Sequence, residues 1–397
     1  MIGGVLLFIL AGVAVGVVTG LIPGLHVNTV VLVLIGLGLS YEPLNLAVFL
    51  FSVAITHTFL DFIPAVLLGV PSGDTALAVL PAHKLVLSGR ASEAISLTLI
   101  GSIACLGLGA MLIPIFLKII PLAYASLEEY MAYVLIGCSG FLILREKNWK
   151  KLYAALIFLM SGMLGLVVLR SPLIKEPLLP LLTGLFGFSL LVANLKNKSK
   201  LPQQIKAKIG ITRKSVFRGI VGGTLAGSIV GFLPGFGPSQ AAVMANAITG
   251  QGNDKEFLIT LGGINTANML FTLVALLTIG KTRSGTVAGI SRLIELNMNS
   301  MFYLVGAGLI AGGIALILGM KMAMTFPKMI RRISYSKLNM AVIILVAGIV
   351  ALLSGFWGLA VLAISSCVGL VAHNLGVRKM HLMGVLILPT IMWFSGF

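Results

Sequence analysis

Long runs of apolar residues alternate with short polar loops along the whole chain. A helix of about 20 apolar residues crosses the hydrocarbon core of a bilayer. Runs of that length recur from residue 4 to residue 396. They predict an all-α, multi-pass protein of the cell membrane with about 10–12 transmembrane crossings.

The apolar runs divide into a series of predicted helices. Those of the first half cover residues 4–22, 27–40, 44–60, 94–117, 130–144, 152–169 and 177–195. Those of the second half cover residues 216–233, 238–249, 257–280, 300–320, 338–354, 356–372 and 381–396. Two further segments, 61–81 and 280–292, carry several Pro, Gly or charged residues, and we interpret both as broken helices or re-entrant hairpins.

One pattern of glycines and a proline occurs twice, 211 residues apart (223 − 12 = 211). In GVAVGVVTGLIPGLHVNT it comprises Gly12, Gly16, Gly20, Pro23 and Gly24, and in GTLAGSIVGFLPGFGPSQ it comprises Gly223, Gly227, Gly231, Pro234 and Gly235. The same offset pairs Thr75 with Thr286. Agreement over so many positions predicts that the chain contains two copies of one membrane unit.

A basic segment separates the two copies. Residues 196–215 carry several Lys and Arg residues and no acid, which predicts a cytoplasmic linker. Residues 1–195 then form the first repeat with extra spans, and residues 216–397 form the second. Counting spans from the linker places equivalent points on opposite sides of the membrane, so we expect inverted repeats, as in many secondary transporters.

Composition and charge agree with a membrane protein. Of the 397 residues, 58% are hydrophobic and only 10% are charged, against about 25% charged in soluble domains. The net charge of +17 lies mostly in short loops, where it is a topology signal. We therefore expect no nucleic-acid partner, although the linker could contact anionic membrane lipid. The three cysteines show neither metal-ligand spacing nor a disulfide framework, so no metal or cofactor is expected.

The two Pro-Gly breaks are followed by hydrogen-bonding residues. His26, Asn28 and Thr29 follow the first break, and Ser239 and Gln240 follow the second. A helix that begins at a break presents free N–H groups and the positive end of its dipole, which favour an anion. The alternative is that the glycines only allow close helix packing, which is our interpretation of Gly12, Gly16 and Gly20.

The two broken segments end in similar turns, VPSGDT at 70–75 and KTRSGT at 281–286. Their hydroxyl groups can contact a substrate, although plain helix caps would look the same. The fixed cation of Arg283 can bind a substrate carboxylate, or it lies at the extracellular interface with Lys281. The predicted substrate-binding residues are Pro23, Gly24, Asn28, Thr29, Ser72, Thr75, Pro234, Gly235, Ser239, Gln240, Asn268, Arg283, Ser284 and Thr286.

Few ionisable residues interrupt the apolar runs. His57 and Asp61 are four residues apart on one helical face and could pair. Such residues usually line a pathway, and His titrates near neutrality, so we assign these two to coupling with Na⁺ or H⁺. The alternative is a structural or interfacial pair. We expect His381, near a loop, to be a surface residue.

Several stretches resemble the TctA-type large permease subunit of the tripartite tricarboxylate transporters. GLIPGLHVNT and GFLPGFGPSQAA look like the paired Pro-Gly motifs of that family, and LLGVPSGDTALAVLPAHKLVLSGRASEAISLTLIGS at 67–102 looks like its GRAxEA segment. The resemblance implies a secondary carboxylate transporter coupled to an ion gradient, with a small membrane subunit and an extracytoplasmic binding protein. The chain departs from the family pattern in its GKTRSGT turn and in His26, where a small residue is usual.

Our first hypothesis is a secondary active transporter for an organic anion, a di- or tricarboxylate, with alternating access at the repeat interface. The alternative is an intramembrane enzyme or lipid-handling protein that uses His57 and Asp61; a third is a structural or channel protein. The sequence holds no Walker motif, HExxH or GxSxG, so we expect no enzyme activity. A homo-oligomer is compatible with the sequence.

Overall fold

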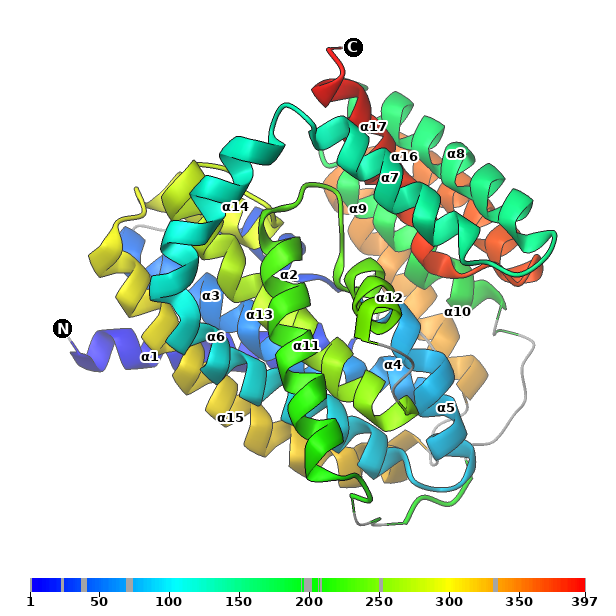
Figure 1. The fold of residues 1–397 in the computed structure, drawn as a ribbon. Helices are drawn as coiled ribbons and strands as arrows, with labels where there is room; N and C mark the ends of the chain where they lie inside the picture. The colour runs from blue at the N-terminus through cyan, green and yellow to red at the C-terminus, as the bar shows by residue number, and fades with distance from the viewer. Residues whose placement is uncertain are drawn as a thin grey trace.

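The computed structural model describes residues 2–22, 25–36, 41–68, 74–193, 195, 202–205, 207, 209–249, 253–330 and 335–396. Every regular element in these ranges is a helix (Figure 1). Eight of the described helices are long and apolar enough to cross a membrane, and Met131–Leu144, Leu178–Ala193 and Lys379–Phe394 are shorter apolar helices. The prediction of an all-α, multi-pass membrane protein is confirmed.

The helices follow the predicted order. Those of the first half are α1 (Ile2–Leu21), α2 (Val27–Gly36), α3 (Pro43–Leu60), α4 (Phe62–Leu68), η1 (Ala76–Ala78), α5 (Val79–Leu87), α6 (Ala91–Leu127), α7 (Met131–Leu144), α8 (Lys150–Leu169), α9 (Leu178–Leu182), η2 (Thr183–Phe188) and α10 (Ser189–Ala193). Those of the second half are α11 (Arg213–Phe232), α12 (Pro238–Thr249), α13 (Asp254–Ile279), α14 (Gly285–Leu293), α15 (Met298–Ile330), α16 (Tyr335–Asn374), η4 (Lys379–Met383) and α17 (Gly384–Phe394).

Helices α6 and α16 are longer than predicted. The helix expected over 94–117 continues as α6 through Pro114 and Pro121 to Leu127, because membrane helices tolerate proline where neighbours satisfy the freed backbone groups. The spans expected over 338–354 and 356–372 are joined in α16 across a kink at Gly355, whose φ is 68°. Only glycine adopts that backbone conformation readily.

Glycines set the close packing of α1 on α3. A Cβ atom on Gly12 would lie 2.7 Å from the carbonyl oxygen of Phe49, and one on Gly16 would lie 2.8 Å from that of Val53. Contacts this short leave no room for a side chain, so the two backbones pack directly. Both contacts advance along the chain together, which makes α1 and α3 parallel.

The second half repeats this packing in α11 and α13. A Cβ atom on Gly223 would lie 3.0 Å from the carbonyl oxygen of Thr260, and one on Gly227 would lie 3.1 Å from that of Ile264. Each of these residues is 211 positions beyond its counterpart in α1 or α3. The sequence offset therefore corresponds to the same contact between the same backbone atoms.

Contacts of α6 relate the two halves. Gly262 lies against Thr98, and Gly109 lies against Leu270, so α6 and α13 are parallel.

Contacts of α15 with α6 and α3 give the relative directions of α3 and α13. Gly312 lies against Leu106, and Gly319 lies against Leu99, so α15 runs antiparallel to α6. Gly308 lies against Phe51 while Gly312 also approaches Phe59, so α15 is parallel to α3. It follows that α3 and α13, and with them α1 and α11, run in opposite directions. These opposite directions support the inverted repeat. The orientation of the two repeats in a membrane stays a prediction, and so does the linker between them at residues 196–215.

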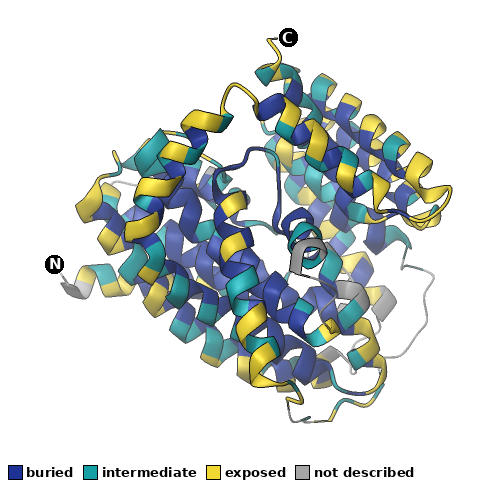
Figure 2. Ribbon diagram, viewed as in Figure 1, coloured by how far each residue is buried: buried dark blue, intermediate teal, exposed yellow. Residues whose placement is uncertain are grey.

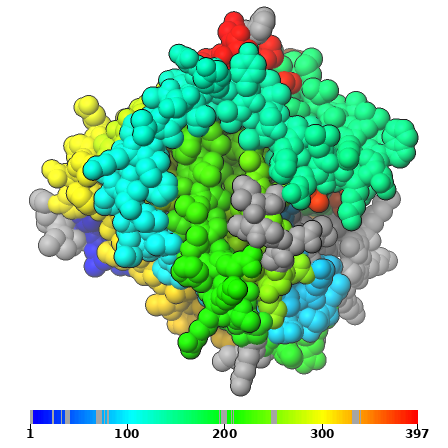
Figure 3. All heavy atoms as spheres, viewed as in Figure 1, coloured from blue at the N-terminus to red at the C-terminus, as the bar shows by residue number. Residues whose placement is uncertain are grey.

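The helices form two bundles around a buried centre. Most residues of α3 and α13 are buried, and Figure 2 shows the two helices running through the middle of the larger bundle. Helix α11 lies on the face seen in Figure 3. Its apolar Leu225 and Ile229 are exposed, as expected of a helix that meets lipid. Helices α7 to α10, α16 and α17 form the second bundle (Figure 1).

Charged residues gather where the described part of the linker meets the starts of α6 and α13. The side chain of Glu93 is fully buried and lies 2.6 Å from Arg90 and 2.8 Å from Lys255. Its Oε1 also accepts a hydrogen bond of 3.0 Å from the backbone N–H of Gly210. This cluster fastens the linker to both halves of the larger bundle.

Candidate functional site

The first break separates α1 from α2. Helix α1 ends at Leu21 and α2 begins at Val27, while Pro23 and Gly24 lie outside the described residues. The Nδ1 atom of His26 accepts a hydrogen bond of 3.2 Å from the backbone N–H of Asn28. Thr29 is buried, and its hydroxyl has no hydrogen-bond partner among the described residues. The start of α2 therefore carries an unused polar group.

The start of α2 meets the start of α14. The side chain of Asn28 lies directly against Gly285, where any Cβ atom would collide with it. The hydroxyl of Ser284 caps α14 by accepting a hydrogen bond of 3.2 Å from the backbone N–H of Val287. Thr286, in the first turn of α14, is buried. Two helix N-termini from different halves of the chain thus face one another.

The equivalent contact joins the start of α12, in the second half of the chain, to Asp74, in the first half. The hydroxyl of Ser239, at the start of α12, donates a hydrogen bond of 3.0 Å to the backbone carbonyl of Asp74. Ser239 is the equivalent of Asn28, and Asp74 is the equivalent of Gly285, at the offset of 211 residues. Thr75, the residue before η1, is fully buried, and Ser72 lies outside the described residues.

The second Pro-Gly break forms the turn before α12. Pro234 and Gly235 lie in this turn, where Gly235 has a φ of 75° that favours glycine. Gln240 accepts a hydrogen bond of 3.0 Å from Gly237 N–H and donates one of 3.3 Å to the carbonyl of Met380 in η4. Sequence reasoning missed η4 as a wall of this site, because a 3₁₀ turn next to a loop carries no motif.

The buried carboxylate of Glu146 holds η4 in place. The expectation that His381 is a surface residue is wrong, because only 2% of it is exposed and its Nε2 lies 3.1 Å from Oε1 of Glu146. Arg378 also lies 3.4 Å from that oxygen. Burial alone would raise the pKa of the Glu146 carboxyl, but the hydrogen bond with His381 and the charge of Arg378 bring it below its usual value.

His57 and Asp61 lie at the centre of the larger bundle with separate partners. His57 Nδ1 lies 3.1 Å from the hydroxyl of Thr19, and its ring stands edge-on to that of His26 with centroids 5.2 Å apart. The carboxylate of Asp61 accepts hydrogen bonds of 3.2 and 3.4 Å from the Nδ2 atom of Asn265. No described hydrogen bond joins the side chains of His57 and Asp61.

Two other predicted residues lie near the same helices. Asn268 of α13 is half-buried and packs beside Gly227 of α11. Arg283 lies just before α14 with its guanidinium 5.5 Å from the centre of the Tyr124 ring, and its Nε and Nη2 atoms are buried without a hydrogen-bond partner among the described residues. Lys281 lies 4.0 Å from Glu128 instead.

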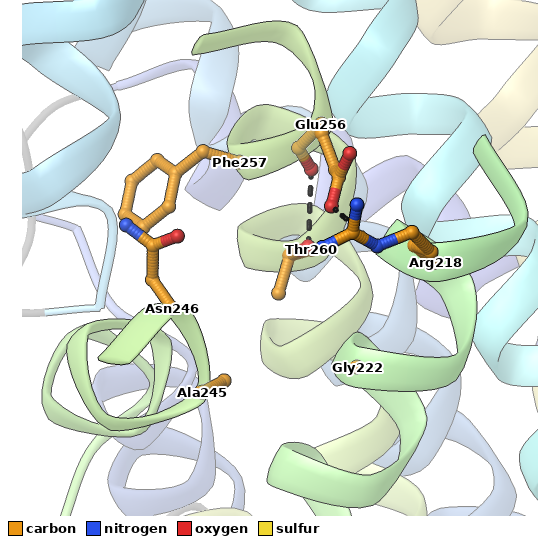
Figure 4. Close-up of a pocket in the computed structure, with 7 residues that line it drawn as sticks. All are labelled: Arg218, Gly222, Ala245, Asn246, Glu256, Phe257 and Thr260. Carbon is orange, nitrogen blue, oxygen red and sulfur yellow. Dashed lines mark hydrogen bonds and ion pairs between the residues drawn. The ribbon is translucent and has the colours of Figure 1, made fainter. Parts of the chain in front are cut away.

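A separate hollow lies at the other end of α11, between the starts of α11 and α13 and the helix α12. It is lined by Arg218, Gly222, Ala245, Asn246, Glu256, Phe257 and Thr260 (Figure 4). On the side of the hollow away from α12, Arg218 forms an ion pair of 3.5 Å with Glu256. This hollow is distinct from the break at Pro234. Among the described residues, no group of three His, Cys, Asp or Glu could hold a metal ion.

The family model described as "Tripartite tricarboxylate transporter TctA family" matches residues 6–384. The chain belongs to the TctA family. The resemblance inferred from the Pro-Gly motifs is thereby confirmed, and the match includes the starts of α2, α12 and α14.

The chain is also similar to a relative over nearly its whole length. An uncharacterized protein of Methanocaldococcus jannaschii, MJ1079, is 32% identical over 410 residues, which cover 98% of each chain. No solved structure matches the chain. As a TctA-family member, the chain is a component of a tripartite tricarboxylate transporter and a multi-pass membrane protein, and the description of the family implies further subunits.

Proposed function

We propose that this TctA-family chain is a secondary active transporter for an organic anion, a di- or tricarboxylate. The observation that carries the proposal is the crossed meeting of helix starts, Asn28 with Gly285 and Ser239 with Asp74. The N-termini of α2, α12 and α14 contribute free N–H groups and positive dipole ends, which suit carboxylates.

Unpartnered buried groups support an anion at this place. The hydroxyl of Thr29 and the Nε and Nη2 atoms of Arg283 are buried without a hydrogen-bond partner among the described residues. A buried donor without a partner costs about 1–3 kcal/mol, so a bound carboxylate would relieve that cost. Ser284 and Thr286, on the first turn of α14, and Gln240 on α12 complete the proposed contacts.

Alternating access would come from movement of one bundle against the other. The starts of α12 and of η4 meet through Gln240 and Met380, so the proposed site borders the second bundle. The ion gradient would act through His57 and Asp61, both buried in the larger bundle. The separate partners of these two residues give no support to the alternative of an intramembrane enzyme that uses them as a pair.

The proposed complex follows from the tripartite description of the family. The chain would act with a small membrane subunit and an extracytoplasmic binding protein that delivers the anion.

Counterflow in proteoliposomes tests the transport function. Vesicles that hold the chain, with and without the two partner subunits, are loaded with unlabelled citrate, succinate or malate and diluted into the labelled acid. We expect transient accumulation of at least one label. Absence of counterflow for the whole panel in the complete assembly would contradict the proposal.

Matched variants test the proposed contacts. Ser284→Ala and Arg283→Gln should weaken apparent affinity by about 1.5–3 kcal/mol, because each removes a hydrogen bond to a charged group. Ser291→Ala and Arg292→Gln change exposed residues of the same helix and should leave affinity unchanged. Unchanged affinity in Arg283→Gln for every anion would remove Arg283 from the site.

A further inference from the structure

We propose that the coupling ion is a proton, bound by a cluster of four titratable side chains in the first half of the chain. The cluster comprises His26, His57, Asp61 and Asp74. The inference rests on the proposed transport function, and it assigns the ion and the groups that carry it.

The four groups form a connected series. His57 and Asp61 lie one turn apart on α3, and the backbone N–H of Asp61 donates to the carbonyl of His57 at 2.9 Å. The rings of His57 and His26 are in edge-to-face contact. Asp74 is close enough to both His26 and Asp61 for their charges to interact. A proton can therefore be shared between two pairs of residues. His26 and Asp74 are partly exposed, and His57 and Asp61 are buried.

The cluster lacks a fixed positive charge. Neither carboxylate forms an ion pair with any described residue, and the side-chain donor on Asp61 is the neutral amide of Asn265. An ionised carboxylate in such a setting is costly unless a cation joins it. The cluster should therefore take up a positive ion whenever it is closed off from water.

No charged side chain on the surrounding elements meets that need. Helices α1, α2, α4 and α12 contribute no charged residue, and Arg283 lies over Tyr124. The remaining titratable residues on the packed elements form no described ion pair or hydrogen bond with the cluster. They are His83 and Lys84 of α5, Glu93, Cys105, Lys118 and Tyr124 of α6, Asp254, Lys255 and Glu256 of α13, Arg292 of α14, Tyr303, Lys321 and Lys328 of α15, and Lys379 and His381 of η4.

The chemistry of the cluster favours a proton over Na⁺. Sodium sites in transporters are built from oxygen ligands such as backbone carbonyls of broken helices, whereas half of this cluster is imidazole. His26 accepts a hydrogen bond at Nδ1, so its other nitrogen carries the proton in the neutral ring. Two adjacent cationic rings would repel one another, so the pair should hold one added proton.

The second half of the chain lacks this chemistry. At the offset of 211 residues, the four positions are occupied by Gly237, Asn268, Thr272 and Gly285, none of which titrates. The second half instead carries Arg283. We therefore assign proton binding to the first half and charge recognition of the anion to the second, a division of labour within one duplicated fold.

Gradient-driven uptake tests the assignment. The complete assembly in proteoliposomes is given labelled citrate or succinate under either a pH step or a Na⁺ step. A pH step should drive uptake and a Na⁺ step should not. His57→Asn, which installs the residue of the second half, and Asp61→Asn should lower pH-driven uptake about tenfold while counterflow at equal pH persists. His83→Asn and Glu42→Gln, at exposed positions, serve as controls. Uptake driven by Na⁺ alone, or full pH-driven uptake in both variants, would overturn the proposal.

An infrared measurement separates this proposal from the transport function. Purified full chain in lipid nanodiscs is compared in acidic and alkaline buffer, without substrate. The absorption band of a protonated carboxyl group should appear in the acidic buffer and should not change when Na⁺ is added. The band should be absent from the spectrum of Asp61→Asn and present in that of Asp61→Glu. If this band is present while no acid is transported, the transport function fails and the proton site stands. If Asp61→Asn does not fold, Asp74→Asn replaces it. The proton site would be refuted if the wild type showed no pH-sensitive carboxyl band, or if neither variant removed that band.

Discussion

Ser239 and Asp74 are joined by a hydrogen bond of 3.0 Å, from the hydroxyl of one to the backbone carbonyl of the other. This bond fixes the start of α12, in the second half of the chain, to the second broken segment of the first half. Asn28 and Gly285 make the equivalent contact in the opposite sense. The helix that follows the break in each half therefore contacts the second broken segment of the other half: α12 contacts the segment at Asp74, and α2 contacts the start of α14.

Gly285→Ala tests whether this contact positions the site. An added Cβ would collide with the side chain of Asn28, which must then turn away from the start of α14. We expect apparent affinity for the anion to fall by about 1.5–3 kcal/mol, the value of a hydrogen bond to a charged group. The melting temperature should change little, because Asn28 is a small flexible side chain. Gly313→Ala, whose Cβ meets nothing within 4 Å, is the control; equal affinities in the two variants would contradict the prediction.

The sequence alone predicted this arrangement in part. The offset of 211 residues identified equivalent helices because glycine is required wherever two backbones touch, as at Gly16 and Gly227. Free helix starts after each break followed from Pro23 and Pro234. The exchange between halves could not be predicted, since it depends on how α2 and α14 pack across the centre.

Other parts of the site left no trace in the sequence. Met380 contributes only a backbone carbonyl to Gln240, and any residue type could supply that. The burial of His381 depends on Glu146, which is distant in the chain. Pro114 and Pro121 are ordinary helix breakers in water, but α6 continues through them because its neighbours in the fold complete the packing.

The equivalent glycines should be equally intolerant of a side chain. Gly16→Ala would place a Cβ 2.6 Å from Thr56 Cβ, and Gly227→Ala would place one 2.7 Å from Ala267 Cβ. Each should destabilise the protein by about 1–3 kcal/mol through overpacking, seen as a lower melting temperature in detergent. Gly107→Ala, in open space on α6, should be neutral or stabilising. A stable Gly227→Ala beside an unstable Gly16→Ala would argue against equivalent packing.

Glu146→Gln should reveal the pH dependence of the η4 anchor. The pKa of the Glu146 carboxyl is lower in the folded protein than its usual value. Its stabilising contribution is therefore present above the unfolded pKa and is lost as the pH falls through the folded pKa. The variant should melt below the wild type at neutral pH, and the two curves should converge in acid. Glu129→Gln, at an exposed position, should match the wild type throughout; a gap that widens in acid would contradict this assignment.

Two ion pairs of the linker region should differ sharply in strength. Glu93 is fully buried between Arg90 and Lys255, so Lys255→Met leaves part of a buried charge unpaired and should cost about 3–5 kcal/mol. The pair of Lys84 and Asp254, only 2.6 Å long, is exposed and its loss in Lys84→Met should cost less than about 1 kcal/mol. Chemical denaturation of both variants measures the difference, and equal losses would show that burial does not set the strength of these pairs.

Protection of engineered cysteines by substrate tests the central claim most directly. Ser239→Cys and Ser284→Cys, from opposite halves, are each placed in a chain without Cys138 and Cys367 and labelled with N-ethylmaleimide in proteoliposomes. If the exchanged helix starts enclose one anion site, citrate or the transported acid identified by counterflow will slow labelling at both positions and leave Ser291→Cys unaffected. Protection at neither position by an acid that the protein transports would contradict the shared site.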